Sequence, residues 1–244
     1  RLHPQSKDWR FDAEEDDNRA WDSVASSKNF TYKAEAKRPW SPKTILELLE
    51  QTRHEFEKLM GPGPDVVIQV EDRICESNNY GARSEINRQI YSLREHFREI
   101  KIICELPMEF GYTEPEQDLA YHFFVHELFH CWISGPVSSR YEPSVEAITQ
   151  YMTSWILVYL GWCSEDLWVQ EQVSWQEIAE TEDPPYTAIA IYKLLFDEMY
   201  TYNPENLFAF CRDLADCFYQ QRAREEIDIL PILQHYLGIE LAED

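Results

Sequence analysis

Two histidines four residues apart, with a glutamate directly after the first, are the residues of this chain best suited to chemistry. They form the sequence His126-Glu127-Leu128-Phe129-His130, an HExxH pattern. On a helix, residues four apart lie on one face about 6 Å apart along the axis, so both imidazoles can reach one Zn²⁺. Glu127 would lie beside the metal, where it can accept a proton from the attacking water and later donate it to the leaving group.

A catalytic zinc usually takes three protein ligands, and this pattern supplies only two. The extension HExxHxxGxxH is absent, because Ile133 follows where glycine is needed and the only later histidine is the distant His235. Glu142 and Glu146 both lie near the start of the next predicted helix, around Pro143. Because proline suits the first turn, Glu146 falls one turn inside the helix, and we favour it over Glu142 as the third ligand.

His122 extends the histidine series by one more helical turn. His122 and His130 would be about 12 Å apart along the axis, too far to share one ion. The pair His122 and His126 has Phe123 at the position where the base is needed. We therefore interpret His122 as a core residue or as a residue that supports the ligands.

The HExxH pattern, followed by a glutamate on the next helix, resembles the gluzincin metallopeptidases, the thermolysin-like and aminopeptidase-like branch of the zincins. The segment 143–151, Pro-Ser-Val-Glu-Ala-Ile-Thr-Gln-Tyr, is similar to the second helix of many members. The specific part of the resemblance is confined to residues 122–151. It implies a zinc cofactor held by His126, His130 and Glu146, with Glu127 as the general base and acid.

The same family places a later tyrosine or histidine where it stabilises the oxyanion of the tetrahedral intermediate. Residues 186–195 resemble the helix that begins with such a tyrosine, although the usual glycine shortly after it is missing. The resemblance thus implies Tyr186 as a second catalytic residue. Tyr192 and His235 are the alternatives.

Two weaker resemblances concern substrate binding. Residues 107–109, Pro-Met-Glu, resemble the segment with which aminopeptidases of this clan hold a free amine, although its flanking Gly and Asn are replaced. In zincins an edge strand above the metal also pairs with the extended peptide. By their order in the chain, Glu109 and the predicted strand 100–106 would take these two roles.

The elements that must position these residues follow from hydrophobic periodicity and from turn residues. Thr113 and Glu116 have the spacing of a capping box, with Pro115 near the first turn, and indicate the start of the helix that carries HExxH. We expect helices over residues 45–60, 84–99, 113–134 and 143–161 and in several segments after 164, and strands over 66–70 and 100–106.

Strands before residue 110 and helices after it indicate an α+β fold. With the resemblance, we expect a zincin-like arrangement in which a small mixed sheet with helices packs against a mainly helical C-terminal subdomain, the active-site helix between them. Residues 1–40 are polar and acidic without a sustained period, so we predict an extended arm. The predicted division is 1–40 (arm), 41–135 (α+β subdomain with HExxH) and 136–244 (helical subdomain).

Charge restricts the partners. The chain holds 22 Lys and Arg against 45 Asp and Glu, a net charge of −23. Nucleic acids and anionic membranes attract basic surfaces, so we expect neither as a partner. No apolar run reaches the roughly 18 to 20 residues of a membrane span. We expect a peptide or protein substrate with a bias toward basic peptides; the oligomeric state stays open.

Six cysteines could form disulfides, but several lie within apolar periodic runs, where a buried thiol behaves as a small hydrophobe. None has the CxxC spacing of a structural zinc site. We favour reduced cysteines over a disulfide framework, and a cytoplasmic over a secreted location, although the sequence does not decide the compartment.

The sequence thus predicts a zinc-dependent metallopeptidase. The first alternative is a zincin-fold protein with little catalysis that acts as a binding partner or inhibitor. A zinc hydrolase with non-peptide substrates is the second alternative.

Overall fold

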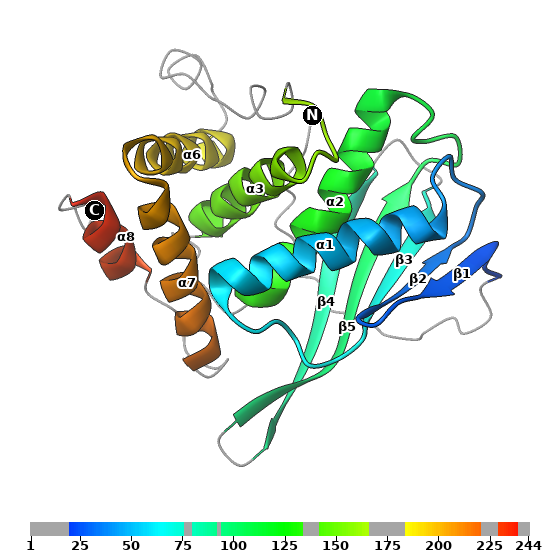
Figure 1. Ribbon diagram of the computed structural model, residues 1–244, viewed down its shortest axis with the longest axis horizontal. Helices are drawn as coiled ribbons and strands as arrows, with labels where there is room; N and C mark the ends of the chain where they lie inside the picture. Colours follow the sequence, from blue (N-terminus) through cyan, green and yellow to red (C-terminus); the bar gives the residue numbers. More distant parts are fainter. Residues whose placement is uncertain are drawn as a thin grey trace.

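The chain folds into an α+β structure in which a five-stranded mixed sheet lies beside a group of helices (Figure 1). The computed structural model describes residues 20–75, 80–91, 94–133, 142–165, 184–220 and 229–238 of the 244. The described strands are β1 (Ser23–Ser26), β2 (Phe30–Ala34), β3 (Ile68–Ile74), β4 (Gly81–Tyr91) and β5 (Arg94–Leu106). The described helices are α1 (Pro42–Met60), α2 (Glu114–Ile133), α3 (Glu142–Tyr159), α6 (Pro184–Tyr202), α7 (Pro204–Gln220) and α8 (Leu230–Leu237).

The strand order is β1-β2-β3-β5-β4. β2, β3 and β5 run parallel, whereas β1 and β4 are antiparallel to their neighbours. The long β4–β5 hairpin projects well beyond the other strands (Figure 1). Helices α1 and α2 pack on one another and on the sheet, and α3, α6, α7 and α8 form the helical part beside them (Figure 1).

Capping residues fix the ends of the helices that matter for the site. The Ser41 hydroxyl accepts a hydrogen bond from the Thr44 N–H at 3.1 Å and begins α1. At the start of α2, the Glu116 carboxylate accepts from the Thr113 N–H at 3.2 Å, as the capping-box spacing predicts. Both cues are local, so both helix starts could be predicted from sequence.

A continuous core of aromatic side chains holds α2 in place. Phe56 of α1 meets Phe129 and Trp132 edge to face, with ring centroids 5.1 and 5.5 Å apart. Phe124, one helical turn nearer the start of α2, packs edge-on against Tyr32 of β2. These side chains are buried, so the back of α2 is fixed between α1 and the sheet.

Most of the predicted elements are confirmed: α1, α2 and α3 match the helices expected over 45–60, 113–134 and 143–161, and β3 and β5 match the expected strands. The prediction of a helix over residues 84–99 is wrong. The described residues of this stretch, 84–91 and 94–99, belong to β4 and β5, which pair antiparallel in a register that sets Ile86 opposite Ile100. Its backbone hydrogen bonds therefore go to the neighbouring strand, and this non-local pairing overrides the local periodicity.

The extended arm predicted for residues 1–40 is also wrong for part of its length. Residues 23–34 form β1 and β2, and the side chains of Phe30 and Tyr32 are buried in the core. The alternation of buried and half-buried residues in β2 is the pattern of a strand covered on one face. Residues 1–19 lie outside the described part of the chain. The other predicted domain boundaries stay predictions.

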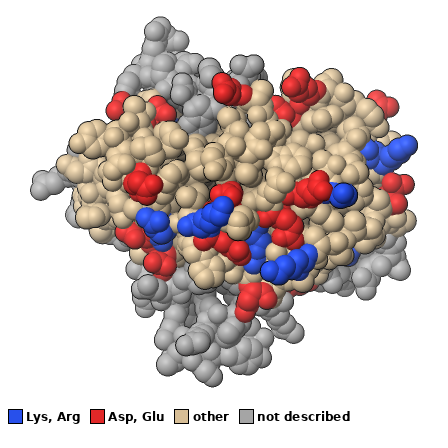
Figure 2. All heavy atoms as spheres, viewed as in Figure 1, with Lys and Arg blue, Asp and Glu red and all other residues tan. Residues whose placement is uncertain are grey.

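All six cysteines lie in the described part of the chain, and none of them forms a disulfide bond. On the face that α1 forms, acidic and basic side chains are intermixed (Figure 2), with ion pairs such as Lys43 with Glu47 and Lys58 with Glu55. Among the described residues, no helix combines the length and the apolar character needed to cross a membrane.

Candidate metal centre

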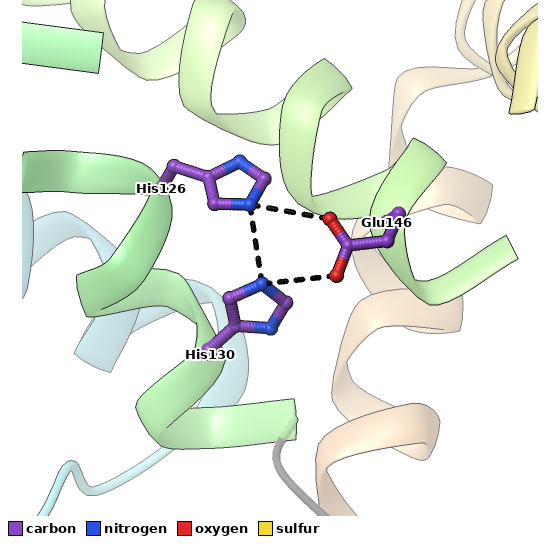
Figure 3. A group of neighbouring side chains, drawn as sticks. All are labelled: His126, His130 and Glu146. Carbon is purple, nitrogen blue, oxygen red and sulfur yellow. Dashed lines mark hydrogen bonds and ion pairs between the residues drawn. The ribbon is translucent and has the colours of Figure 1, made fainter. Parts of the chain in front are cut away.

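The two histidines of the HExxH pattern lie on the same face of α2. Their Nε2 atoms are 3.2 Å apart, and the side chains are 14% and 15% exposed. The rings meet nearly edge to face, with centroids 4.8 Å apart (Figure 3). This follows from the spacing of four residues, which places His126 and His130 one above the other.

Glu146 reaches the same point from α3 (Figure 3). Its Oε2 lies 3.3 Å from Nε2 of His126, and its Oε1 lies 3.4 Å from Nε2 of His130. The side chain is 38% exposed, so the cluster is open to solvent at this residue. Glu142, the alternative third ligand, is exposed at the first position of α3 and is not part of the cluster.

The three side chains are spaced as the ligands of one ion. The contacts between their donor atoms measure 3.2, 3.3 and 3.4 Å. Two ligands at tetrahedral positions around an ion at 2.0 to 2.1 Å are separated by about 3.3 to 3.4 Å. Two imidazole nitrogens and a carboxylate oxygen are also a donor set of catalytic zinc sites. The residues present therefore fit a tetrahedral metal ion with one position left for another ligand.

The electrostatics of the cluster agree with this geometry. Burial raises the pKa of the Glu146 carboxyl, but the hydrogen bonds from His126 and His130 outweigh it and hold that pKa well below its usual range. Burial lowers the pKa of His130, but the hydrogen bond and charge of Glu146, with a smaller effect of Glu127, raise it overall. The negative carboxylate at this point thus attracts positive charge.

Glu127 is buried on α2 with 7% of its surface exposed. Its negative charge contributes to raising the pKa of His130. Burial is the main reason why the pKa of the Cys104 thiol on β5 is raised, and the charge of Glu127 adds to that effect. The carboxylate therefore acts electrostatically on His130 of the cluster and on a buried thiol of the sheet. This position suits a group that exchanges protons beside the cluster.

His122 lies next to His126 on α2, with ring centroids 5.8 Å apart, and is not part of the cluster. Burial, with the positive charges of His126 and Lys193, lowers the pKa of His122 to about 3. It is therefore a neutral imidazole at physiological pH, consistent with the interpretation as a core or supporting residue. Sequence reasoning missed Lys193, a buried residue of α6 whose own pKa burial lowers to about 8. Its one signal was a single charge within an apolar stretch.

The remaining predicted site residues are spread over other elements. Tyr186 lies in the first turn of α6, and its side chain is outside the described part of the structure. Tyr192 stacks on Phe196 along α6. His235 is exposed on α8 and contacts Tyr236, and Glu109 is exposed in the loop after β5.

The prediction that residues 100–106 form an edge strand that binds the substrate is wrong. Residues 100–106 belong to β5, which pairs with β3 on one side and with β4 on the other. Both edges of β5 are therefore occupied, and no peptide can add to it. Among the described strands, β4 forms the edge of the sheet on this side, and α2 packs against it.

Comparison with known proteins adds no assignment: no protein-family model matches the chain, and no curated protein matches it in sequence.

Proposed function

We propose that this protein is a zinc-dependent metallopeptidase with a gluzincin-type site. The observation that carries the proposal is the convergence of three donor atoms from His126, His130 and Glu146 at the separations of a tetrahedral ion. The HExxH pattern adds a carboxylate at the position of a general base.

The residues have distinct roles in the proposed hydrolysis. His126, His130 and Glu146 hold the metal. When bound, Zn²⁺ supplies a Lewis acid that activates water and polarises the substrate carbonyl. Glu127 accepts the proton of the attacking water and donates it to the amine that leaves. The family resemblance implies that Tyr186 stabilises the oxyanion. Tyr186 lies at the start of α6, and its role stays a prediction.

Among the described strands the sheet has two edge strands, β1 and β4, and α2 packs against β4. β4 replaces β5 as the candidate strand for an extended substrate, because it is the edge strand that packs against the helix carrying HExxH. A peptide bound there would add a strand and present its backbone above α2. Coordinates of a peptide complex without pairing to β4 would exclude this binding mode. The expected bias toward basic peptides follows from the charge of −23 and is tested by a cleavage profile.

Three preparations test the proposed function: the parent protein, Glu127→Gln and Glu114→Gln. The control residue Glu114 is exposed at the start of the same helix. We expect the parent to bind one Zn²⁺ and to cleave members of a peptide library. Glu127→Gln should keep the zinc but lower kcat/KM by about 10²- to 10⁴-fold, and Glu114→Gln should behave as the parent.

Each result that departs from this has a definite meaning. Unchanged cleavage in Glu127→Gln contradicts the assignment of the base. Stoichiometric zinc with no cleavage of any peptide favours the zincin-fold protein that acts as a binding partner or inhibitor. Failure of the parent to bind Zn²⁺ contradicts the metal centre itself.

A further inference from the structure

Two buried nitrogen atoms without hydrogen-bond partners lie on adjacent turns of α2. One is Nδ1 of His126 and the other is Nε2 of His122. Among the buried polar side-chain atoms of the described residues they are the only unpartnered ring nitrogens. Their rings are 5.8 Å apart between centroids and inclined by 30°. Unsatisfied buried polar atoms are rare in folded proteins, so a neighbouring pair of them calls for a physical reason.

Metal binding determines which nitrogen of His126 carries the proton. Nε2 of His126 faces His130 and Glu146 and is the nitrogen that binds the ion in the proposed function. A neutral imidazole that binds metal through Nε2 carries its hydrogen on Nδ1. This N–H needs an acceptor, because leaving a buried donor unpaired costs about 1–3 kcal/mol.

His122 can supply that acceptor. A buried imidazole is neutral and has one bare ring nitrogen that accepts a hydrogen bond. With the hydrogen of His122 on Nδ1, its buried Nε2 accepts. Because the ring centroids are 5.8 Å apart, one bridging water molecule or a rotation of either side chain would connect the two nitrogens.

We infer that His122 is a positioning residue for the metal centre, which accepts the Nδ1 hydrogen of His126 directly or through one water molecule. It thereby fixes the tautomer and the ring orientation of the first ligand. The carboxylates and carbonyls that usually hold a metal-binding histidine are replaced here by a second imidazole one turn earlier on the same helix. The inference rests on the proposed metal centre and adds a residue that the HExxH pattern does not contain.

The test compares His122→Gln with His122→Phe. The Gln side chain carries an oxygen acceptor near the position of Nε2, whereas Phe fills similar space without any acceptor. The measurement is the dissociation constant for Zn²⁺, obtained by competition with a chromophoric chelator. The visible spectrum of the Co²⁺-loaded protein serves as a second readout. His54→Gln, at an exposed position of α1, is the matched control.

We expect His122→Phe to weaken zinc affinity by about 10- to 100-fold and to alter the cobalt spectrum. His122→Gln should stay within a few-fold of the parent, and His54→Gln should equal it. The metal-free forms, compared by thermal unfolding, report any effect on folding alone.

Three results would overturn the inference, and each is distinct. If the parent binds no Zn²⁺, the metal centre and the inference fail together. If the parent binds Zn²⁺ and His122→Phe binds it equally well, the metal centre stands and the positioning role fails. If the Gln and Phe variants lose affinity and metal-free stability to the same extent, His122 acts by packing.

Discussion

The buried cluster around Arg38 and the cluster around His126 differ in what their polar atoms contact. The first joins Arg38 to Asp72 in the interior, with side chains 1% and 0% exposed. The second is the group of His126, His130 and Glu146, whose carboxylate is 38% exposed. Both hold an acid close to basic groups, so charge alone does not distinguish them.

The cluster at Arg38 is closed upon itself. Asp72 accepts hydrogen bonds from Arg38 Nε at 3.0 Å and from Nη2 at 2.6 Å, and from the Tyr32 hydroxyl at 2.8 Å. Trp40 donates to the same hydroxyl. Arg38 Nη1 donates to the carbonyl oxygen of Pro107 at 2.6 Å, in the loop that leads to α2. The polar groups of this cluster thus form hydrogen bonds with one another and with the protein backbone.

In the cluster at His126, the imidazole nitrogens and the carboxylate oxygens point toward one common position. Its nearest contacts run between nitrogen and oxygen atoms that can all bind one cation, and Nδ1 of His126 has no partner among the described residues. The comparison shows how to separate a structural network from a candidate ligand site. In a structural network, each hydrogen-bond donor meets an acceptor of the protein. In a candidate ligand site, several atoms that can bind a cation point to the same place.

The largest expected effect concerns the closed cluster. Asp72→Ala leaves the Arg38 guanidinium buried without its carboxylate, so we expect the free energy of unfolding to fall by about 3–5 kcal/mol. Urea denaturation of the metal-free protein measures it. Glu47→Gln, which breaks an exposed pair with Lys43, should change stability by less than about 1 kcal/mol. Equal effects of the two variants would erase the distinction.

The next prediction concerns the open cluster. Glu146→Gln should weaken zinc affinity by more than the roughly 10- to 100-fold that follows loss of a group supporting a ligand. Its effect on the unfolding free energy of the metal-free protein should be smaller than that of Asp72→Ala. Equilibrium dialysis against Zn²⁺ measures the affinity. Glu142→Gln is the matched control, and loss of zinc in that variant instead would reassign the third ligand.

The contribution of the Glu50 carboxylate to stability should depend on pH, because its oxygen atoms accept hydrogen bonds in the folded state. Burial raises the pKa of Glu50, but hydrogen bonds from Ser27 and Asn29 lower it overall. Its contribution is therefore present above its ordinary pKa of 4.5 and lost as the pH falls through the lower value of the folded state.

We expect Glu50→Gln to be about 1.5 kcal/mol less stable than the parent at pH 7, a deficit that shrinks as the medium becomes acidic. Unfolding curves recorded from pH 7 to pH 3 measure the difference. A deficit that does not depend on pH would mean that packing, not charge, is lost.

The smallest expected effect concerns the contact between α3 and α6. The Tyr151 hydroxyl donates to Oδ1 of Asp197 at 3.1 Å. Tyr151→Phe should lower the unfolding free energy by about 1 kcal/mol without changing zinc affinity, because neither Tyr151 nor Asp197 belongs to the cluster of candidate ligands. Tyr159→Phe, at a position 63% exposed on the same helix, should have little effect. A large loss of zinc in Tyr151→Phe would extend the open cluster to this contact.

The cues that could be read from the sequence are local. The pairing of His126 with His130 follows from helical spacing, and the start of α2 follows from Thr113 and Glu116. Glu146 was favoured over Glu142 for a related reason, since one turn separates them at the start of α3. Each needs only the geometry of a single helix.

The features that the sequence did not yield depend on distant segments. Whether 84–99 is helix or strand was decided by the long pairing of β4 with β5. The insertion of β5 between β3 and β4 withdrew it from substrate binding, and β1 with β2 joined residues 23–34 to the sheet. Periodicity along a chain carries no information on strand order.

The sequence by itself determined which residues could bind a metal, because two of the three candidate ligands share one helix and their spacing fixes their direction. Tertiary structure decided that Glu146 meets them, since the packing of α3 against α2 brings its carboxylate to within 3.4 Å of both imidazoles. It also buried His122, which helical spacing places beside His126, so that a neutral imidazole can serve there as an acceptor. Local chemistry supplies the ligands, and packing between elements makes them converge.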